Sequence, residues 1–318
     1  MTHCFSLRSV MHMAWVLLTV IPTISHAQWQ VRYDVCVRSP TRQYKVLVIE
    51  NQKLTVDFVP HVFWTVHELQ YRKTKLNQAT GYTGSVFHWD GQPIGTGHRT
   101  EHHSEQLIDV TLQVDDQTYR LDKANGKPAN LDFTASGQQI SLIKRSTIGP
   151  MAHQARFDFD PDITGYTVTH RYEVLIPITP KRFAGYRYVF MQMMPKTISR
   201  WCYYDEDGKQ TCGTMSEPDP AKPMPKNQFV FKDAVFKGIA CYSPTEQMGI
   251  AYSYPKQYPG TNHYLDRAAK DNKFRGILFE KDQYQVGEKL TWQMRVLPFD
   301  ATGDNWQTIG WQIIQPTW

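Results

Sequence analysis

Residues 164–178 read TGYTVTHRYEVLIPI, a run rich in β-branched and aromatic residues. Because successive side chains of a strand point to opposite faces, alternation places His170 and Tyr172 on one face and Arg171 and Glu173 on the other. Neither face is wholly apolar. The segment therefore either borders a polar cleft or presents an outer face of weak surface ion pairs on an ordinary sandwich strand.

The same alternation recurs along the chain. It is found in YKVLVIE (44–50), LTVDFVP (54–60), SVFHW (85–89), LIDVTLQVD (107–115), QISLIK (139–144), YRYVFMQMM (186–194), NQFVFK (227–232), GIAYSY (249–254) and LTWQMRVLPF (290–299). Turn residues separate these runs, and only one short helix is predicted, near residues 264–271. Parallel sheets need crossover helices, so the pattern predicts an all-β, antiparallel sandwich or barrel with few short helices. The lack of a sequence repeat disfavours a propeller.

The N-terminus has the order of a signal peptide. Arg8 precedes an apolar run from Ala14 to Ile21, and small residues surround a predicted cleavage point after Ala27. This run is too short to span a bilayer, and no later segment is both long and free of charge. We therefore expect residues 1–27 to be removed, leaving residues 28–318 as a single β-sandwich domain that is secreted or periplasmic and has no membrane span.

The cysteines agree with export to an oxidising compartment. Once Cys4 leaves with the signal peptide, Cys36, Cys202, Cys212 and Cys241 remain. Cys202 and Cys212 flank an Asp-Gly turn at residues 207–208, so we expect a disulfide across that hairpin and a second one between Cys36 and Cys241. Four cysteines allow three pairings, and a zinc site is disfavoured because there is no closely spaced pair.

Charge and aromatic content narrow the classes of partner. The formal net charge of +5 falls to +4 without Arg8, and the basic residues are scattered among acids, so no nucleic-acid partner is expected. Tyrosine and tryptophan are abundant within the strand-like stretches. Such rings either fill a β core or stack on the C–H face of a sugar.

The densest polar cluster is IGTGHRTEHHSEQ, residues 94–106. If this segment enters a strand, Glu101, His103 and Glu105 share one face while His102 faces the other. Three interpretations stay open: a metal site, although no known metal-binding spacing is matched; an acid/base site in which a carboxylate tunes a histidine; or a plain polar edge.

Two further segments carry candidate residues. Residues 254–275 form an irregular stretch suited to gripping a ligand, and it includes Tyr254, Lys256, Tyr258, His263, Tyr264, Asp266 and Arg267. DFDPD, residues 158–162, has oxygen ligands that suit Ca²⁺, but the spacing is not that of an EF-hand, and a solvent-facing Asp-Pro turn is favoured. No other cofactor is expected, because there is no P-loop, dinucleotide fingerprint or serine-hydrolase elbow.

Three stretches together resemble the galactose-mutarotase-like supersandwich proteins: TGYTGSVFHWDGQPIGTGHRTEHHSEQLIDVTLQVD (80–115), YSYPKQYPG (252–260) and GEKLTWQMRVLPF (287–299). The resemblance is one of layout over residues 30–300. It implies an antiparallel β-supersandwich whose concave face binds a saccharide. The superfamily includes epimerases, polysaccharide lyase domains and non-catalytic modules, so the fold alone does not choose among them.

We expect a carbohydrate-active protein, with a lyase that cleaves a uronate-containing polysaccharide by β-elimination as the leading interpretation. That reaction needs a cation at the carboxylate, a base and an acid. Arg99, Arg171 or Arg267 could supply the cation, His103 or His170 the base, and Tyr254 or Tyr264 the acid. The remaining predicted substrate contacts are His98, Glu105, Lys256 and His263. The alternatives are a glycan-binding protein without catalysis and a sugar epimerase or mutarotase.

Overall fold

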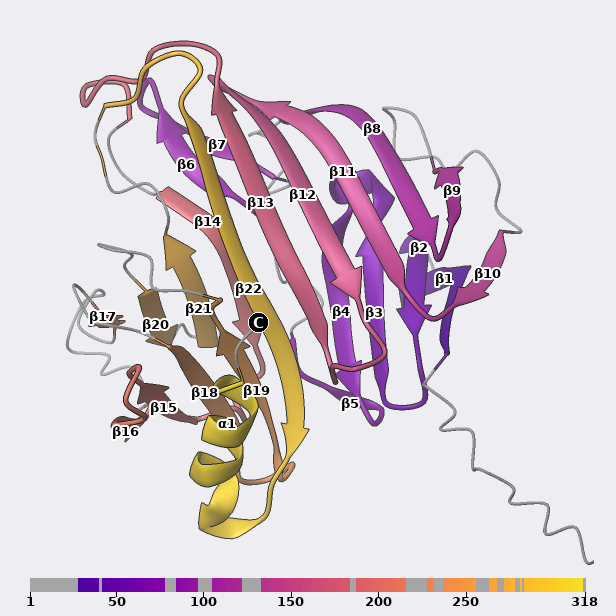
Figure 1. Ribbon diagram of the computed structural model, residues 1–318, viewed down its shortest axis with the longest axis vertical. Coiled ribbons are helices and arrows are strands. Elements are labelled where there is room, and N and C mark those ends of the chain that lie inside the picture. Colours follow the sequence, from indigo (N-terminus) through magenta and orange to yellow (C-terminus); the bar gives the residue numbers. More distant parts are fainter. Residues whose placement is uncertain are drawn as a thin grey trace, which may run out of the picture.

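The computed structural model describes residues 28–39, 42–77, 84–96, 105–121, 133–183, 187–215, 228–231, 237–255, 263–267, 272–277, 281 and 283–316. Within these ranges every pair of strands is antiparallel, and the strands form three sheets (Figure 1). The prediction of an all-β, antiparallel sandwich is therefore confirmed. The predicted signal peptide lies outside the described residues.

Two of the sheets have six strands each. The first has the order β10-β1-β2-β3-β4-β5 and consists of β1 (Trp29–Ser39), β2 (Arg42–Glu50), β3 (Leu54–Val59), β4 (Thr65–Tyr71), β5 (Thr74–Lys75) and β10 (Thr134–Gly137). The second has the order β17-β20-β21-β14-β6-β7 and consists of β6 (Val86–Trp89), β7 (Gln92–Gly95), β14 (Arg187–Met194), β17 (Gln228–Phe231), β20 (His263–Arg267) and β21 (Asn272–Ile277).

The third sheet has ten strands in the order β16-β15-β18-β19-β22-β13-β12-β11-β8-β9. Its strands are β8 (Glu105–Val114), β9 (Gln117–Arg120), β11 (Ile140–Ile148), β12 (Met151–Phe159), β13 (Tyr166–Val174), β15 (Arg200–Tyr204), β16 (Gln210–Thr214), β18 (Gly238–Ser243), β19 (Met248–Ser253) and β22 (Lys289–Asp300). Two short 3-10 helices, η1 (Pro60–Val62) and η3 (Gly303–Asn305), lie between elements.

Both six-stranded sheets pack against one face of the ten-stranded sheet, which we call the inner face (Figure 1). Phe58 of β3 contacts Phe157 of β12 with ring centroids 4.9 Å apart, and Phe190 of β14 stacks on Trp292 of β22 at 5.6 Å. Residues of β12 alternate between buried and half-buried along its whole length, as a sheet with one covered face requires. Each such buried large side chain stabilises the fold by roughly 1.5–3 kcal/mol.

One end of the opposite, outer face is covered by the helix α1 (Trp306–Ile314) (Figure 1). Trp306 stacks on Tyr242 of β18 at 5.2 Å, and the Tyr204 hydroxyl donates a hydrogen bond to the carbonyl of Gln307. Gly310 is needed at this contact, because a Cβ there would lie 2.8 Å from the Tyr204 hydroxyl oxygen. The other end of the outer face, over β8, β11, β12 and β13, is polar.

The helix prediction was wrong on two counts. Residues 263–267 form the strand β20, hydrogen-bonded to β17 and β21, whereas the predicted helix began at residue 264. The α-helix that the described residues contain is α1, near the C-terminus. Its buried Trp306, Gly310 and Ile314 are four residues apart, which is the spacing of one helix face.

The Cys202–Cys212 disulfide is present, and it joins directly paired residues of β15 and β16. Residues 205–209 connect these strands, with Gly208 at a φ of 79°. The predicted bond between Cys36 and Cys241 was wrong, since Cys241 is a free, buried thiol in the inner core. Burial raises the pKa of this thiol, so it acts there as an apolar side chain.

Candidate functional site

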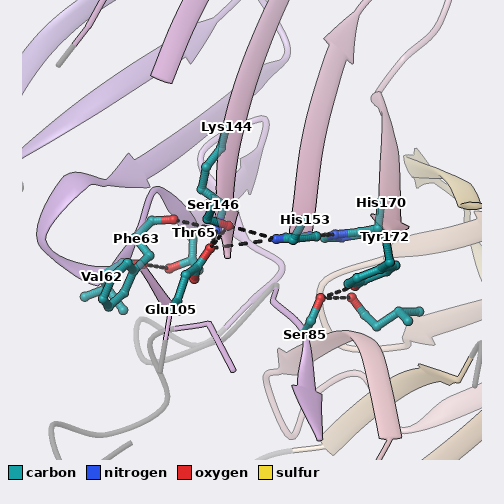
Figure 2. Close-up of polar contacts among 11 residues, drawn as sticks. Val62, Phe63, Thr65, Ser85, Glu105, Lys144, Ser146, His153, His170 and Tyr172 are labelled. Carbon is teal, nitrogen blue, oxygen red and sulfur yellow. Dashed lines mark hydrogen bonds and ion pairs between the residues drawn. The ribbon is translucent and has the colours of Figure 1, made fainter. Parts of the chain in front are cut away.

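A chain of polar side chains is buried on the inner face, where β8, β11, β12 and β13 lie side by side (Figure 2). The Lys144 ammonium lies 2.7 Å from Glu105 Oε1, and the Ser146 hydroxyl donates to the same oxygen at 2.7 Å. Ser146 Oγ is 3.2 Å from His153 Nδ1, and His153 Nε2 is 2.9 Å from His170 Nδ1. Five side chains from four strands thus form one continuous hydrogen-bonded chain.

The Glu105 carboxylate can only accept hydrogen bonds, and this fixes which atom donates in each hydrogen bond of the chain. Because Ser146 gives its only proton to the Glu105 carboxylate, its oxygen must accept from His153 Nδ1–H. His153 Nε2 is then an acceptor and receives the Nδ1–H of His170. His170 Nε2 is left as a bare acceptor, and it has no hydrogen-bond partner among the described residues.

Burial and charge set the protonation of the chain. Burial alone would raise the pKa of Glu105, but the Lys144 ammonium and the nearby His153 ring outweigh it and hold this pKa at about 2. Burial lowers the pKa of His153 and holds that of His170 well below its usual value, with the neighbouring His153 and Lys144 acting in the same direction. At neutral pH the chain therefore consists of one ion pair and two uncharged imidazoles.

Further contacts fix the positions of Lys144 and His153 within the buried chain. Lys144 donates a second hydrogen bond, 3.0 Å long, to the carbonyl of Phe63, which has a φ of 54° in the turn after η1. Tyr172 stacks on His153 with ring centroids 4.8 Å apart, and its hydroxyl is hydrogen-bonded to Ser85 (Figure 2). The buried chain is thus a rigid part of the core.

The outer face of the same strands carries a groove of about 420 Å³, which we call the outer groove. The side chains that face it are Ile108, Arg145, Ala152, Gln154, Arg171, Glu173, Lys289 and Thr291. The inward-facing residues between them, such as His153 and Tyr172, contribute only backbone. Strand register places Arg145, Gln154, Arg171 and Thr291 in one row across four strands.

Among the described side chains that face the outer groove, each charged group except Arg171 has a partner of opposite charge. Arg145 makes a two-pronged ion pair with Asp109, one prong of which is 2.9 Å long. The Lys289 ammonium lies 3.8 Å from Glu173. Arg171 has no hydrogen-bond or ion-pair partner in the part of the chain that the structure describes, and its side chain is exposed. The groove therefore presents one uncompensated guanidinium.

The sequence-predicted site residues do not gather at one place. Arg171 lies in the outer groove, whereas His170, Glu105 and Tyr254 are buried on the inner face or in the core and are each 1–3% exposed. His170 therefore cannot reach a ligand in the outer groove, since the sheet separates them. His98, Arg99, His103 and Lys256 lie outside the described residues. His263, Tyr264 and Arg267 belong to β20, where only the backbone is described.

Sequence reasoning missed Lys144, Ser146 and His153 in the buried chain, and Ile108, Arg145 and Gln154 in the groove. Alternation within β12 does place His153 on the same side as Phe157, which signals an inward-facing histidine. Its partners come from three other strands, so they could be found only with the register of the sheet in hand.

The described residues show neither a metal site nor a membrane-spanning helix. Within the described ranges, no group of three or more His, Cys, Asp or Glu side chains is placed to hold a metal ion. Over the same ranges, no helix has the length and apolar character needed to cross a bilayer. The Asp160 carboxylate accepts a hydrogen bond from the backbone N–H of Asp162, as in an Asp-Pro turn.

Comparisons with known proteins show the fold. The chain matches no protein-family model and no curated protein. Its structure is similar to the GH36 alpha-galactosidase AgaB from Geobacillus stearothermophilus, with a TM-score of 0.51 and 9% sequence identity over 87% of this chain and 42% of that one. The chain thus spans less than half the length of that galactosidase.

Two candidate aldose 1-epimerases are also similar. The protein from Klebsiella pneumoniae has a TM-score of 0.46 and 12% identity over 91% of this chain and 88% of that one. The protein from Escherichia coli has a TM-score of 0.41 and 12% identity over 78% of this chain and 96% of that one. The chain has a β-sandwich fold that is structurally similar to part of the galactosidase.

Proposed function

We propose that this protein acts on carbohydrates and holds an acidic saccharide in the outer groove, with the acid on Arg171. The observation that carries the proposal is the uncompensated Arg171 guanidinium in a groove that is otherwise neutral in charge. A guanidinium binds a carboxylate through two parallel hydrogen bonds. The galactosidase and the candidate epimerases with similar structures are carbohydrate enzymes, which agrees with a saccharide ligand.

The neighbours of Arg171 suit the rest of a sugar. Gln154 and Thr291 flank it in the strand register and offer an amide and a hydroxyl, which can hydrogen-bond sugar hydroxyls. Because Arg145 and Lys289 already have carboxylate partners, the groove has an excess of one positive charge. We therefore infer a ligand with one acidic group per bound unit.

The test is a binding measurement by calorimetry with oligosaccharides of polygalacturonate and alginate, using neutral malto-oligosaccharides for comparison. The acidic ligands should bind, and Arg171→Gln should weaken binding roughly tenfold or more, the value of one charged hydrogen bond. Arg156→Gln is the matched control. Arg156 lies on β12 and faces outward like Gln154, but it does not line the groove. Equal binding of acidic and neutral oligosaccharides, or equal affinity of Arg171→Gln and wild type, would contradict the proposal.

The reaction that we propose for such a ligand is β-elimination at a uronate, because Arg171 offers the cation that the carboxylate requires. His170 does not fit the role of base, since its imidazole lies on the inner face and is 1% exposed. The base that we propose is the other histidine predicted for that role, His103, which lies outside the described residues.

The ultraviolet absorbance of unsaturated products tests this reaction. His103→Ala should abolish turnover and leave the affinity for acidic oligosaccharides within about twofold, as removal of a base predicts. If uronic-acid polymers bind but none of a panel yields an unsaturated product, the protein is a glycan-binding protein without catalysis.

A further inference from the structure

Strand β8 contains a β-bulge at the edge of the outer groove. Arg145 of β11 pairs with Asp109, and the next residue, Ser146, pairs with Leu107, so Ile108 is an extra residue between them. A bulge turns a side chain away from the face that alternation would give it. Ile108 and Asp109 consequently both face outward, and Ile108 lines the groove.

Ile108 is the one large apolar residue among the described side chains that face the outer groove. Its side chain is 57% exposed, while the rest of the row beside it is charged or polar. Ala152, the neighbour across the groove, is also apolar and leaves space above the sheet. Asp109 meanwhile neutralises Arg145, so the area around Ile108 carries no net charge. The bulge thus builds one apolar contact point into a polar groove.

We propose that the outer groove recognises an acidic saccharide that also carries a methyl-bearing acyl group, such as an acetyl ester or acetamide, and that Ile108 contacts this methyl group. The inference rests on the proposed function, because it adds a second recognition point to the site of Arg171. The rim of an unmodified sugar ring carries hydroxyls, to which an exposed isoleucine gives no hydrogen bond, and the C–H face of the ring is matched by a flat aromatic side chain rather than by a branched one. A methyl group gains by leaving water at this point.

The distance between the two recognition points sets the size of the ligand. Ile108 on β8 and Arg171 on β13 are separated by three strand spacings, which is about 14 Å between backbones. Their side chains point outward into the same groove, so the acid and the acyl group belong to one short oligosaccharide. They do not have to lie on the same sugar ring.

The experiment compares matched pairs of oligosaccharides by calorimetry: oligogalacturonate and its O-acetylated form, and alginate oligosaccharides and their O-acetylated form. At least one acetylated ligand should bind wild type about fourfold more tightly than its unmodified partner, the effect of burying one methyl group. Ile108→Ser should remove this difference. Ile108→Val, which keeps an apolar side chain, should retain it. Because Ile108 is exposed, both variants should fold as wild type does.

The outcomes separate this inference from the proposed function. Tight binding of the acidic ligands with no preference for acetylated forms would overturn the inference alone. A preference that persists unchanged in Ile108→Ser would also overturn it, since another residue would then make the contact. Failure of every acidic oligosaccharide to bind, acetylated or not, would overturn both proposals.

Discussion

At the scale of single residues, the ion pair between Lys144 and Glu105 is a contact whose disruption should strongly affect folding. Both side chains are almost fully buried, and removing one partner leaves the other as an uncompensated charge. We predict that Lys144→Met destabilises the protein by about 3–5 kcal/mol. Lys289→Met is the matched control, because Lys289 makes a lysine–carboxylate ion pair with Glu173 in which both side chains are exposed.

The control should cost about 1 kcal/mol or less, as exposed pairs do. Urea unfolding followed by tryptophan fluorescence measures both changes. Similar losses for Lys144→Met and Lys289→Met would show that the buried chain contributes no more than a surface contact.

At the scale of elements, the hydrogen bond between His153 and His170 joins β12 to β13 and makes this strand pair sensitive to acid. Burial keeps His170 uncharged in the folded state, whereas a histidine in the unfolded chain takes up a proton below about pH 6.5. Stability should therefore fall as the pH falls from 7 to 5, by about 1.4 kcal/mol per pH unit below 6.5 for a fully shifted histidine.

Glu105 acts in the same direction but in a lower window, between its unfolded pKa of 4.5 and its folded value of about 2. The facing Tyr172 does not change charge between pH 5 and 7, because burial raises the pKa of its hydroxyl. Thermal unfolding at several pH values tests the prediction: His170→Gln should flatten the slope between pH 7 and 5, and His88→Gln, outside the chain, should not. A wild-type slope in His170→Gln would contradict it.

The positions of the strands could be predicted from the sequence, but the covered face of each sheet and the helix α1 could not. Alternation located most of the strands and placed His170 and Arg171 on opposite faces, because that pattern depends only on local geometry. It could not say which face is covered, since that depends on two other sheets. The short α1 was missed among strand signals although Trp306, Gly310 and Ile314 follow a helical spacing.

At the scale of the whole molecule, one sheet separates two polar systems. The buried chain that begins at Glu105 lies on the inner face, and the outer groove with Arg171 lies on the other side of the same strands. Only the groove is open to solvent. Predicting this division required the register of β8, β11, β12 and β13, including the bulge at Ile108, and no pattern within a single strand contains that information.

The most direct test of the account is where an acidic oligosaccharide binds. Protein with isotope-labelled isoleucine methyl groups can be titrated with oligogalacturonate and followed by NMR, since Ile108 lines the outer groove and Ile313 belongs to α1 at the other end of the outer face. The account predicts a saturable shift of the Ile108 methyl signal, no shift at Ile313, and loss of the response in Arg171→Gln. A shift at Ile313 with none at Ile108 would contradict it.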